Sequence, residues 1–263
     1  MNKSFQALCA RLQAAGVPDA RFDAAQLYRF VTGRDPRLDD GPDEAEARRL
    51  EELAVRRAAR EPLQYLLGEW DFLDFTLKVG PGVLCPRADS EVVCETAAEL
   101  LQGKQAPVVL DLCAGTGCLG LGVARACPGA QVTCVEKSEA AWPYLVENTA
   151  GTGVRTVQAD VFCWYRTLAP ESVDLIISNP PYLTGEEMES LMPETAHEPA
   201  LALDGGTDGL DFYRLFTEHY AVVLRPGGWL VLEIGCAQAD EVLALGSRCG
   251  WQHGRCRKDY GGN

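Results

Sequence analysis

The sequence is poor in histidine and in long apolar runs, and each shortage excludes a class of protein. Three histidines and eleven cysteines without a Cys-X-X-Cys pair leave no zinc-ligand spacing. No apolar run approaches the roughly 20 residues of a membrane-spanning helix, and the first six residues do not read as a secretory signal. We therefore expect no metal site, no membrane insertion, and reduced cysteines in a cytoplasmic protein.

Basic charge is also scarce. The 263 residues hold 24 Lys and Arg against 38 Asp and Glu, a net charge of −14. Residues 1–75 carry a net −3 and the remainder carries −11. Proteins that grip nucleic acid usually present a basic face to the phosphates. The balance therefore favours a small-molecule or protein substrate.

Residues 1–70 are predicted to form a small helical domain. Apolar residues recur at helical spacing over residues 5–12, and a second helix is expected over residues 22–33. A third helix would carry two i, i+4 ion pairs, Glu44–Arg48 and Glu52–Arg56. This domain resembles a packing or partner-binding module and shows no chemistry of its own.

The rest of the chain changes character. Residues 71–86 are predicted to form a linking β-hairpin with a turn at residues 80–82. From residue 87 to residue 263, strands alternate with helices: strands over 108–112, 131–135, 154–159, 173–178 and 229–234, and helices over 119–126, 139–148, 210–224 and 237–245. This alternation predicts an α/β domain with a parallel sheet covered on both faces. Ligands of such sheets bind beyond the carboxyl ends of the strands.

A glycine-rich turn follows the first predicted strand of this domain. Gly115, Gly117 and Gly120 fit the pattern GxGxxG, and Glu136 ends the next strand 21 residues after Gly115. Glycines let the backbone approach a ligand, and an acid at this distance can hold a ribose. Several classes of nucleoside-binding sheet share the pattern, nicotinamide-dependent oxidoreductases among them. A tight turn without a ligand also stays open.

Two further strand ends carry polar residues. Asp160 follows the third strand, where a carboxylate can accept from an exocyclic amine, although a surface Asp capping a helix fits equally well. The fourth strand ends in Ser178-Asn179-Pro180-Pro181-Tyr182, the most specific feature of the chain. The Asn179 side-chain carbonyl and the Pro180 backbone carbonyl can accept both hydrogens of a planar amide or amine, and Tyr182 can stack on it.

These motifs together resemble class I AdoMet-dependent methyltransferases that act on nitrogen in a planar group. Within them the chain resembles the release factor glutamine methyltransferases (the PrmC/HemK family). Residues 60–68, 83–91, 198–210 and 232–235 carry the rest of the resemblance, which spans about residue 45 to the C-terminus. It implies a Rossmann-like methyltransferase sheet behind an N-terminal helical domain that docks the substrate.

The resemblance also implies an activity and a set of site residues. The activity is methylation of the glutamine amide nitrogen (N5) in the Gly-Gly-Gln loop of class-one peptide release factors, with S-adenosyl-L-homocysteine as product and no need for a metal. Separately, we expect a monomer. The implied cofactor residues are Asp111, Cys113, Ala114, Gly115, Thr116, Gly117, Glu136, Asp160, Val161 and Asn179. The implied catalytic and substrate residues are Asn179, Pro180, Pro181 and Tyr182.

Three other interpretations fit part of the sequence. An adenine-N6 methyltransferase would use the same Asn-Pro-Pro-Tyr site, but the −11 charge opposes phosphate binding. An oxidoreductase leaves that site without a role, and a non-catalytic scaffold would not need it. The sequence departs from the family pattern at Cys113-Ala114, at Glu136, at Ala88 and Ser90, and in the final strand expected after residues 258–261.

Overall fold

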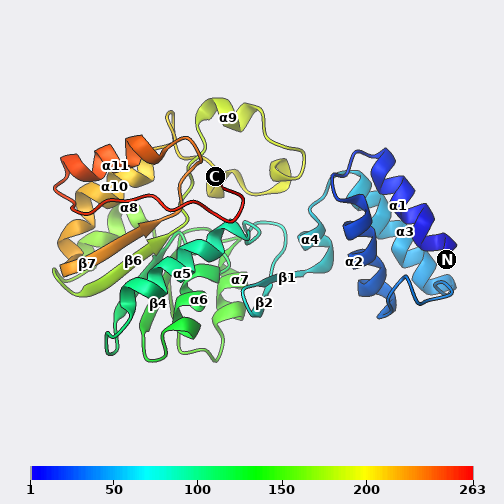
Figure 1. The fold of residues 1–263 in the computed structure, drawn as a ribbon, viewed down its shortest axis with the longest axis horizontal. Helices are drawn as coiled ribbons and strands as arrows, with labels where there is room; N and C mark the ends of the chain where they lie inside the picture. Colours follow the sequence, from blue (N-terminus) through cyan, green and yellow to red (C-terminus); the bar gives the residue numbers. More distant parts are fainter. Residues whose placement is uncertain (1, 263) are drawn as a thin grey trace. The chain divides into compact units, whose positions relative to one another are not determined.

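The computed structural model describes residues 2–262, and this part of the chain divides into two compact units (Figure 1). The helical unit holds residues 2–69 together with residues 191–197. The sheet unit holds residues 70–190 and 198–262. The chain therefore leaves the sheet unit once, after Ser190, and returns at Glu198.

The helical unit contains the three predicted helices and a short fourth one. They are α1 (Lys3–Ala14), α2 (Ala20–Thr32), α3 (Glu44–Ala58) and α4 (Leu63–Leu67). Gly33 ends α2 in the left-handed conformation, and Asp43 and Glu46 form a capping box that starts α3. The helix predictions for this region are confirmed.

One of the two predicted ion pairs on α3 is present and the other is wrong. Glu44 and Arg48 pair at 2.8 Å. Arg56 pairs instead with Glu61, beyond the end of the helix, through contacts of 2.5 and 2.8 Å, and Glu52 pairs with Arg49. The fork of the guanidinium meets both oxygens of Glu61, a geometry that a single i, i+4 contact does not offer.

Residues 191–197 are held to the helical unit by charge. The carboxylate of Glu194 accepts from Arg57 at 2.8 Å and from Arg60 at 2.6 Å through each of two nitrogens. Arg57 is buried and also donates to Asp23 at 2.6 Å. Burial opposes ionisation of Glu194, but the two arginines outweigh it and lower the pKa of Glu194 to about 2.

A two-stranded hairpin follows α4, with the strands β1 (Glu69–Phe72) and β2 (Phe75–Lys78). A hairpin was predicted here, but the predicted position of its turn is wrong. The turn lies at residues 73–74, where Leu73 adopts φ 52° and its N–H donates to Glu91 at 2.9 Å. Residues 80–82 form a separate turn after the hairpin. A leucine in the left-handed region is not a turn signal that sequence patterns contain.

The main sheet is parallel and has five strands within residues 2–262, in the order β5-β4-β3-β6-β7. The strands are β3 (Val108–Leu112), β4 (Gln131–Glu136), β5 (Arg155–Gln158), β6 (Val173–Ser178) and β7 (Leu224–Leu232). The helices are α5 (Asp89–Leu101), α6 (Cys118–Ala126), α7 (Trp142–Thr149), α8 (Val161–Trp164), α9 (Gly185–Glu189), α10 (Asp211–His219) and α11 (Ala239–Arg248). The α/β prediction is confirmed.

Two predicted boundaries at the end of the sheet are wrong. The helix expected over residues 210–224 ends at His219, and the strand expected from residue 229 already begins at Leu224. Leu224 pairs with Val173, and a bulge separates that pair from Leu175 with Trp229. The bulge carries the strand through residues 225–228, whose glycines and proline favour a loop in sequence patterns. No strand follows α11 in the described part of the chain.

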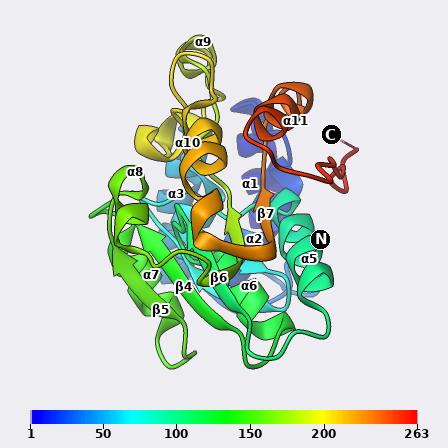
Figure 2. The ribbon, with the colours of Figure 1, turned by 90° about the vertical axis from the view of Figure 1, so that its left-hand side faces the viewer.

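Apolar side chains cover both faces of the sheet. Val109 and Leu175 face one side, against α5 and α6, while Leu110 and Ile176 face the other, against α8 and α10 (Figure 2). This two-sided burial explains the nearly continuous apolar strands in the sequence. Within residues 2–262 no helix has the length and apolarity needed to cross a bilayer, and all eleven cysteines are outside disulfides.

Candidate active site

The sheet register brings the predicted site residues to one edge. Leu112 at the end of β3 pairs with Ser178 at the end of β6, and Ser178 pairs with Leu232 at the end of β7. On the other side, Glu136 pairs with Gln158. The strand order reverses between β3 and β6, which is the point where ligands bind in open parallel sheets.

The turn after β3 departs from ordinary backbone geometry. Cys113, Gly115 and Gly117 all have positive φ, of 60°, 54° and 83°. Two of these positions are glycine, which adopts such angles without strain, but Cys113 carries a side chain there. The turn is fixed to the neighbouring strand by the Ala114 N–H, which donates to the Val135 carbonyl at 3.0 Å.

Asp111 is buried in β3, just before this turn. Its Oδ2 accepts from the Gly120 N–H at 2.8 Å, so the carboxylate holds the start of α6, while its Oδ1 is buried without a partner. Burial raises the pKa of Asp111 to about 7, and the bond from Gly120 opposes that rise. A methyl group on Gly120 would lie 2.4 Å from the Cys134 sulfur, so only glycine fits here.

Glu136 is buried at the end of β4, with its carboxylate held from two sides. Oε2 accepts from the Gly115 N–H at 2.8 Å, and Oε1 accepts from the Ser138 N–H at 2.6 Å. Each oxygen thus keeps lone-pair capacity for another donor. This arrangement suits a carboxylate that accepts from a pair of vicinal hydroxyls.

Asp160 is occupied on both oxygens. Oδ1 accepts from the Phe162 N–H at 3.0 Å and caps α8, and Oδ2 pairs with Lys137 at 2.8 Å. Partial burial opposes ionisation of Asp160, but the bonds from Lys137 and the Phe162 N–H, together with the charge of Lys137, outweigh it and lower the pKa. The alternative that the sequence left open for Asp160, capping of a helix, is present, and any ligand would share the carboxylate with Lys137.

A cavity of about 110 Å³ collects most of the predicted residues. Its lining includes nine of the predicted residues: Cys113, Ala114, Gly115, Thr116, Glu136, Asp160, Val161, Asn179 and Pro181. Asp111, Gly117, Pro180 and Tyr182 are outside this lining. The Oδ1 atom of Asn179 is buried and has no hydrogen-bond partner. A buried acceptor of this kind is costly unless a ligand supplies the donor.

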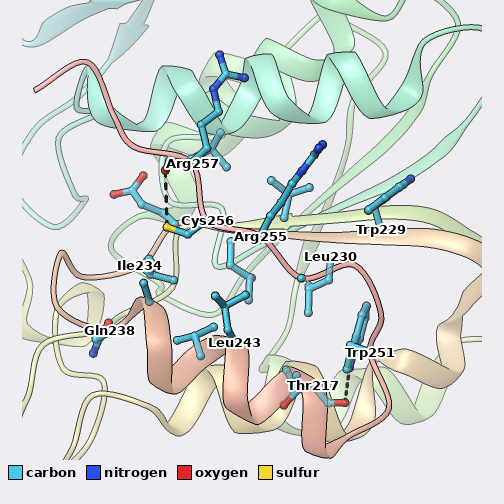
Figure 3. A pocket seen from close by; sticks show the side chains of 18 of the residues that line it. Thr217, Trp229, Leu230, Ile234, Gln238, Leu243, Trp251, Arg255, Cys256 and Arg257 are labelled. Carbon is cyan, nitrogen blue, oxygen red and sulfur yellow. Dashed lines mark hydrogen bonds between the residues drawn. The ribbon is translucent and has the colours of Figure 1, made fainter. Parts of the chain in front are cut away.

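Tyr182 lies elsewhere. Its ring packs against the apolar cluster of Leu210, Tyr213 and Leu245, and it lines a larger groove of about 1930 Å³. Figure 3 shows this groove, which lies between β7, α11 and the C-terminal segment, where the Trp251 indole donates to the Thr217 carbonyl at 2.9 Å. The groove carries none of the cofactor residues predicted from the sequence.

Several residues of the site were not predicted. Ser90 lines the cavity and bonds to Asn179 at 3.3 Å. Glu198 is buried and accepts from the Cys85 N–H at 3.1 Å and from Arg87 at 2.7 Å, which fixes a cavity wall. Phe212 closes the cavity beside Phe162, with ring centroids 5.1 Å apart.

Asn148 ties the hairpin to the turn after β3. Its side chain accepts from the Lys78 N–H at 2.7 Å and donates to the Lys78 and Thr116 carbonyls at 3.0 Å each.

Of the site residues that were not predicted, namely Ser90, Glu198, Phe212 and Asn148, only Ser90 and Glu198 fall in the stretches that carry the family resemblance. Only these two therefore had a signal in the sequence.

Family models match both parts of this chain. Residues 76–205 match the model of the methyltransferase small domain, and residues 5–68 match that of the PrmC N-terminal domain. Three relatives share the name "Release factor glutamine methyltransferase". The protein from Geobacter sulfurreducens is 39% identical over 91% of this chain and 86% of its own length. The one from Gloeobacter violaceus is 42% identical over 86% and 82%, and the one from Mycolicibacterium smegmatis 41% over 89% and 84%. The chain therefore belongs to the release factor glutamine methyltransferase family.

Proposed function

We propose that this protein transfers a methyl group from S-adenosyl-L-methionine to the side-chain amide nitrogen of the glutamine in the Gly-Gly-Gln loop of class-one peptide release factors. The observation that carries the proposal is the buried, unpartnered Oδ1 of Asn179 in the wall of the cavity that also holds the turn after β3. A primary amide brings the N–H donor that this oxygen lacks.

The cavity suits the proposed cofactor. Glu136 keeps an acceptor site on each oxygen for the two ribose hydroxyls. The turn at residues 113–117 would surround the methionine part, and Asp160 and Val161 would border the adenine. The paired rings of Phe162 and Phe212 supply an apolar wall on that side.

The chain's own residues act by positioning. An amide nitrogen is a poor nucleophile because its lone pair is delocalised. Asn179 Oδ1 and the Pro180 carbonyl would accept its two hydrogens and aim the nitrogen at the methyl group. When bound, S-adenosyl-L-methionine supplies an electrophilic methyl on a sulfonium and leaves as S-adenosyl-L-homocysteine. The amide proton is then released to water, so no general base is assigned.

Tyr182 has an indirect part in this proposal. Its ring is anchored in the cluster with Tyr213, and its backbone carbonyl accepts from Gln238 at 3.0 Å. These contacts fix the chain directly after Pro181. We propose that the ring borders the glutamine side chain where that side chain enters.

The helical unit is proposed to dock the release factor, and the enzyme to act as a cytoplasmic monomer. Reduced cysteines and the absence of disulfides fit that compartment. Adenine N6 in nucleic acid is the second candidate, since its amine would also suit Asn179. The excess of acidic residues in the larger half of the chain opposes phosphate binding, so the protein amide is preferred.

A labelled-methyl assay tests the proposal. Purified protein and labelled S-adenosyl-L-methionine are offered a class-one release factor, its loop Gln→Ala variant, DNA and RNA in separate reactions. We expect label on the intact factor alone. Label on nucleic acid alone, or equal label on the factor and its Gln→Ala variant, would overturn the proposal.

A further inference from the structure

The side-chain amide of Asn179 has two different ends, and only one of them is held by the protein. Nδ2 donates to the Ser90 hydroxyl oxygen at 3.3 Å, and the Glu233 carboxylate also accepts from the Asn179 side chain. Oδ1 has no partner. An asparagine amide rotated by half a turn would have nearly the same shape, so packing alone distinguishes the two orientations poorly.

The hydroxyl of Ser90 has its own direction. Ser90 Oγ donates to Oε2 of Glu233 at 2.5 Å. A hydroxyl has a single hydrogen, so once Ser90 donates to Glu233 it can only accept from Asn179. The three side chains therefore form a chain of hydrogen bonds that runs one way, from Asn179 through Ser90 to Glu233.

Both supporting residues are fixed by the fold. Ser90 is fully buried in the first turn of α5. Glu233 follows β7 directly, and its N–H donates to the Ser178 carbonyl at 3.0 Å, next to Asn179 itself. The Tyr213 hydroxyl donates to the Glu233 carbonyl at 3.0 Å. The end of β7 is thereby tied to the end of β6.

We propose that Ser90 and Glu233 are positioning residues, which hold the Asn179 amide with its oxygen toward the glutamine. The inference rests on the proposed function of Asn179. In the reverse orientation Asn179 would present N–H groups to the N–H groups of the substrate amide, and the two would repel. Burial raises the pKa of Glu233, and the hydrogen bonds that it accepts from Ser90 and Asn179 oppose that rise. In its ionised form Glu233 accepts hydrogen bonds and donates none, so it sets the direction.

Removing the hydroxyl is the first test, with Ser90→Thr as the matched control. Ser90→Ala removes the hydroxyl that accepts from Nδ2, so the orientation of the amide is less firmly held, and we expect kcat on the release factor to fall at least about tenfold. Ser90→Thr keeps the hydroxyl, and its kcat should stay near wild type. The dissociation constant for S-adenosyl-L-methionine should be unchanged in both. Equal loss in Ala and Thr variants, or full activity in Ser90→Ala, would overturn the proposal.

Changing the acceptor is the second test, which stands if Ser90→Ala does not fold. Glu233→Gln keeps the shape, but its amide can donate toward Ser90 as well as accept from it, so the chain of hydrogen bonds loses its fixed direction. We expect kcat to fall by about tenfold with an unchanged melting temperature. The kcat of the double variant Ser90→Ala, Glu233→Gln should be no lower than that of the less active single variant, because both residues act through Asn179. Full activity of Glu233→Gln would contradict the proposal.

These outcomes are separable from failure of the proposed function. If the wild-type enzyme transfers no methyl to the glutamine, the function itself is wrong. If the wild type is active and the Ser90 and Glu233 variants match it, only the positioning role is wrong.

Discussion

Charged and polar side chains have different roles in the two units of this chain. In the helical unit a buried arginine, Arg57, joins Asp23 to Glu194, and residues distant in sequence are held together by charge. In the sheet unit the two faces of the sheet are covered by apolar clusters. Buried polar groups such as Glu136 and Ser178 lie where strands end.

The difference teaches where function can reside. A charge that is paired on all sides, like Arg57, has no capacity left for a ligand. The strand ends, in contrast, carry hydrogen-bond acceptors that can still bind a ligand, above all Oδ1 of Asn179, which has no partner. We therefore expect substitutions in the helical network to change stability, and substitutions at the strand ends to change activity.

The largest expected effect is on catalysis. Asn179→Ala removes the acceptor for the substrate amide, and methyl transfer should fall by about 100-fold or more. The melting temperature and the affinity for S-adenosyl-L-methionine should change little, since the hydrogen bond of the side chain to Ser90 is long, at 3.3 Å. Steady-state kinetics with calorimetric titration of the cofactor measure both. Unchanged transfer would remove the central residue from the proposed mechanism.

Next comes the packing between α6 and the sheet. Gly120→Ala places a methyl group 2.4 Å from the Cys134 sulfur and 3.0 Å from Asp111. We expect a loss of about 1–3 kcal/mol in the free energy of unfolding, measured by denaturant titration. Gly185→Ala, where nothing lies within 4 Å, is the control and should be near neutral. Equal stability of the two variants would contradict the close packing.

The charge network of the helical unit gives a smaller effect that depends on pH. Glu194→Gln should cost about 1–2 kcal/mol at neutral pH, because hydrogen bonds to charged groups are lost or weakened. The pKa of Glu194 is lowered from 4.5 to about 2. Its stabilisation is therefore complete above about pH 4.5 and is lost as the pH falls from there toward 2.

Melting temperatures of the wild type and Glu194→Gln across that range measure the effect. The difference between them should shrink as the pH is lowered. Glu52→Gln removes an exposed pair with Arg49 and should change stability by less than about 0.5 kcal/mol at any pH. A Glu194→Gln difference that stays constant with pH would show that Glu194 acts without its charge.

The smallest effect concerns the backbone at Cys113. Two variants, Cys113→Gly and Cys113→Ala, both remove the thiol, so their difference isolates the conformation. Because φ is 60° here, the glycine variant should be more stable than the alanine variant by about 1 kcal/mol. Alanine is normally the more stable of the two in regular structure. Thermal unfolding of both variants decides the sign, and a more stable alanine would contradict the strained turn.

Local patterns predicted much of the fold. The capped helix α3 and the apolar strands β3 and β6 lie where periodicity placed them, because each is set by its own residues. The sequence order of the strand-end motifs also placed most candidate site residues around one cavity.

Contacts between residues distant in sequence could not be predicted from local patterns. Arg56 pairs with Glu61 and not with Glu52, because of side-chain geometry that spacing does not encode. The left-handed Leu73 and the attachment of residues 191–197 to the helical unit depend on tertiary packing. The link from Glu233 to Asn179 joins two strand ends 54 residues apart, and only the sheet register brings them together.

Mass spectrometry of the methylated substrate tests the account most directly. A class-one release factor is incubated with the enzyme and S-adenosyl-L-methionine, digested, and fragmented to locate the added methyl. The account predicts one methyl, on the side-chain nitrogen of the loop glutamine, present with wild-type enzyme and lost with Asn179→Ala. A methyl on any other residue, or an equal yield from Asn179→Ala, would contradict it.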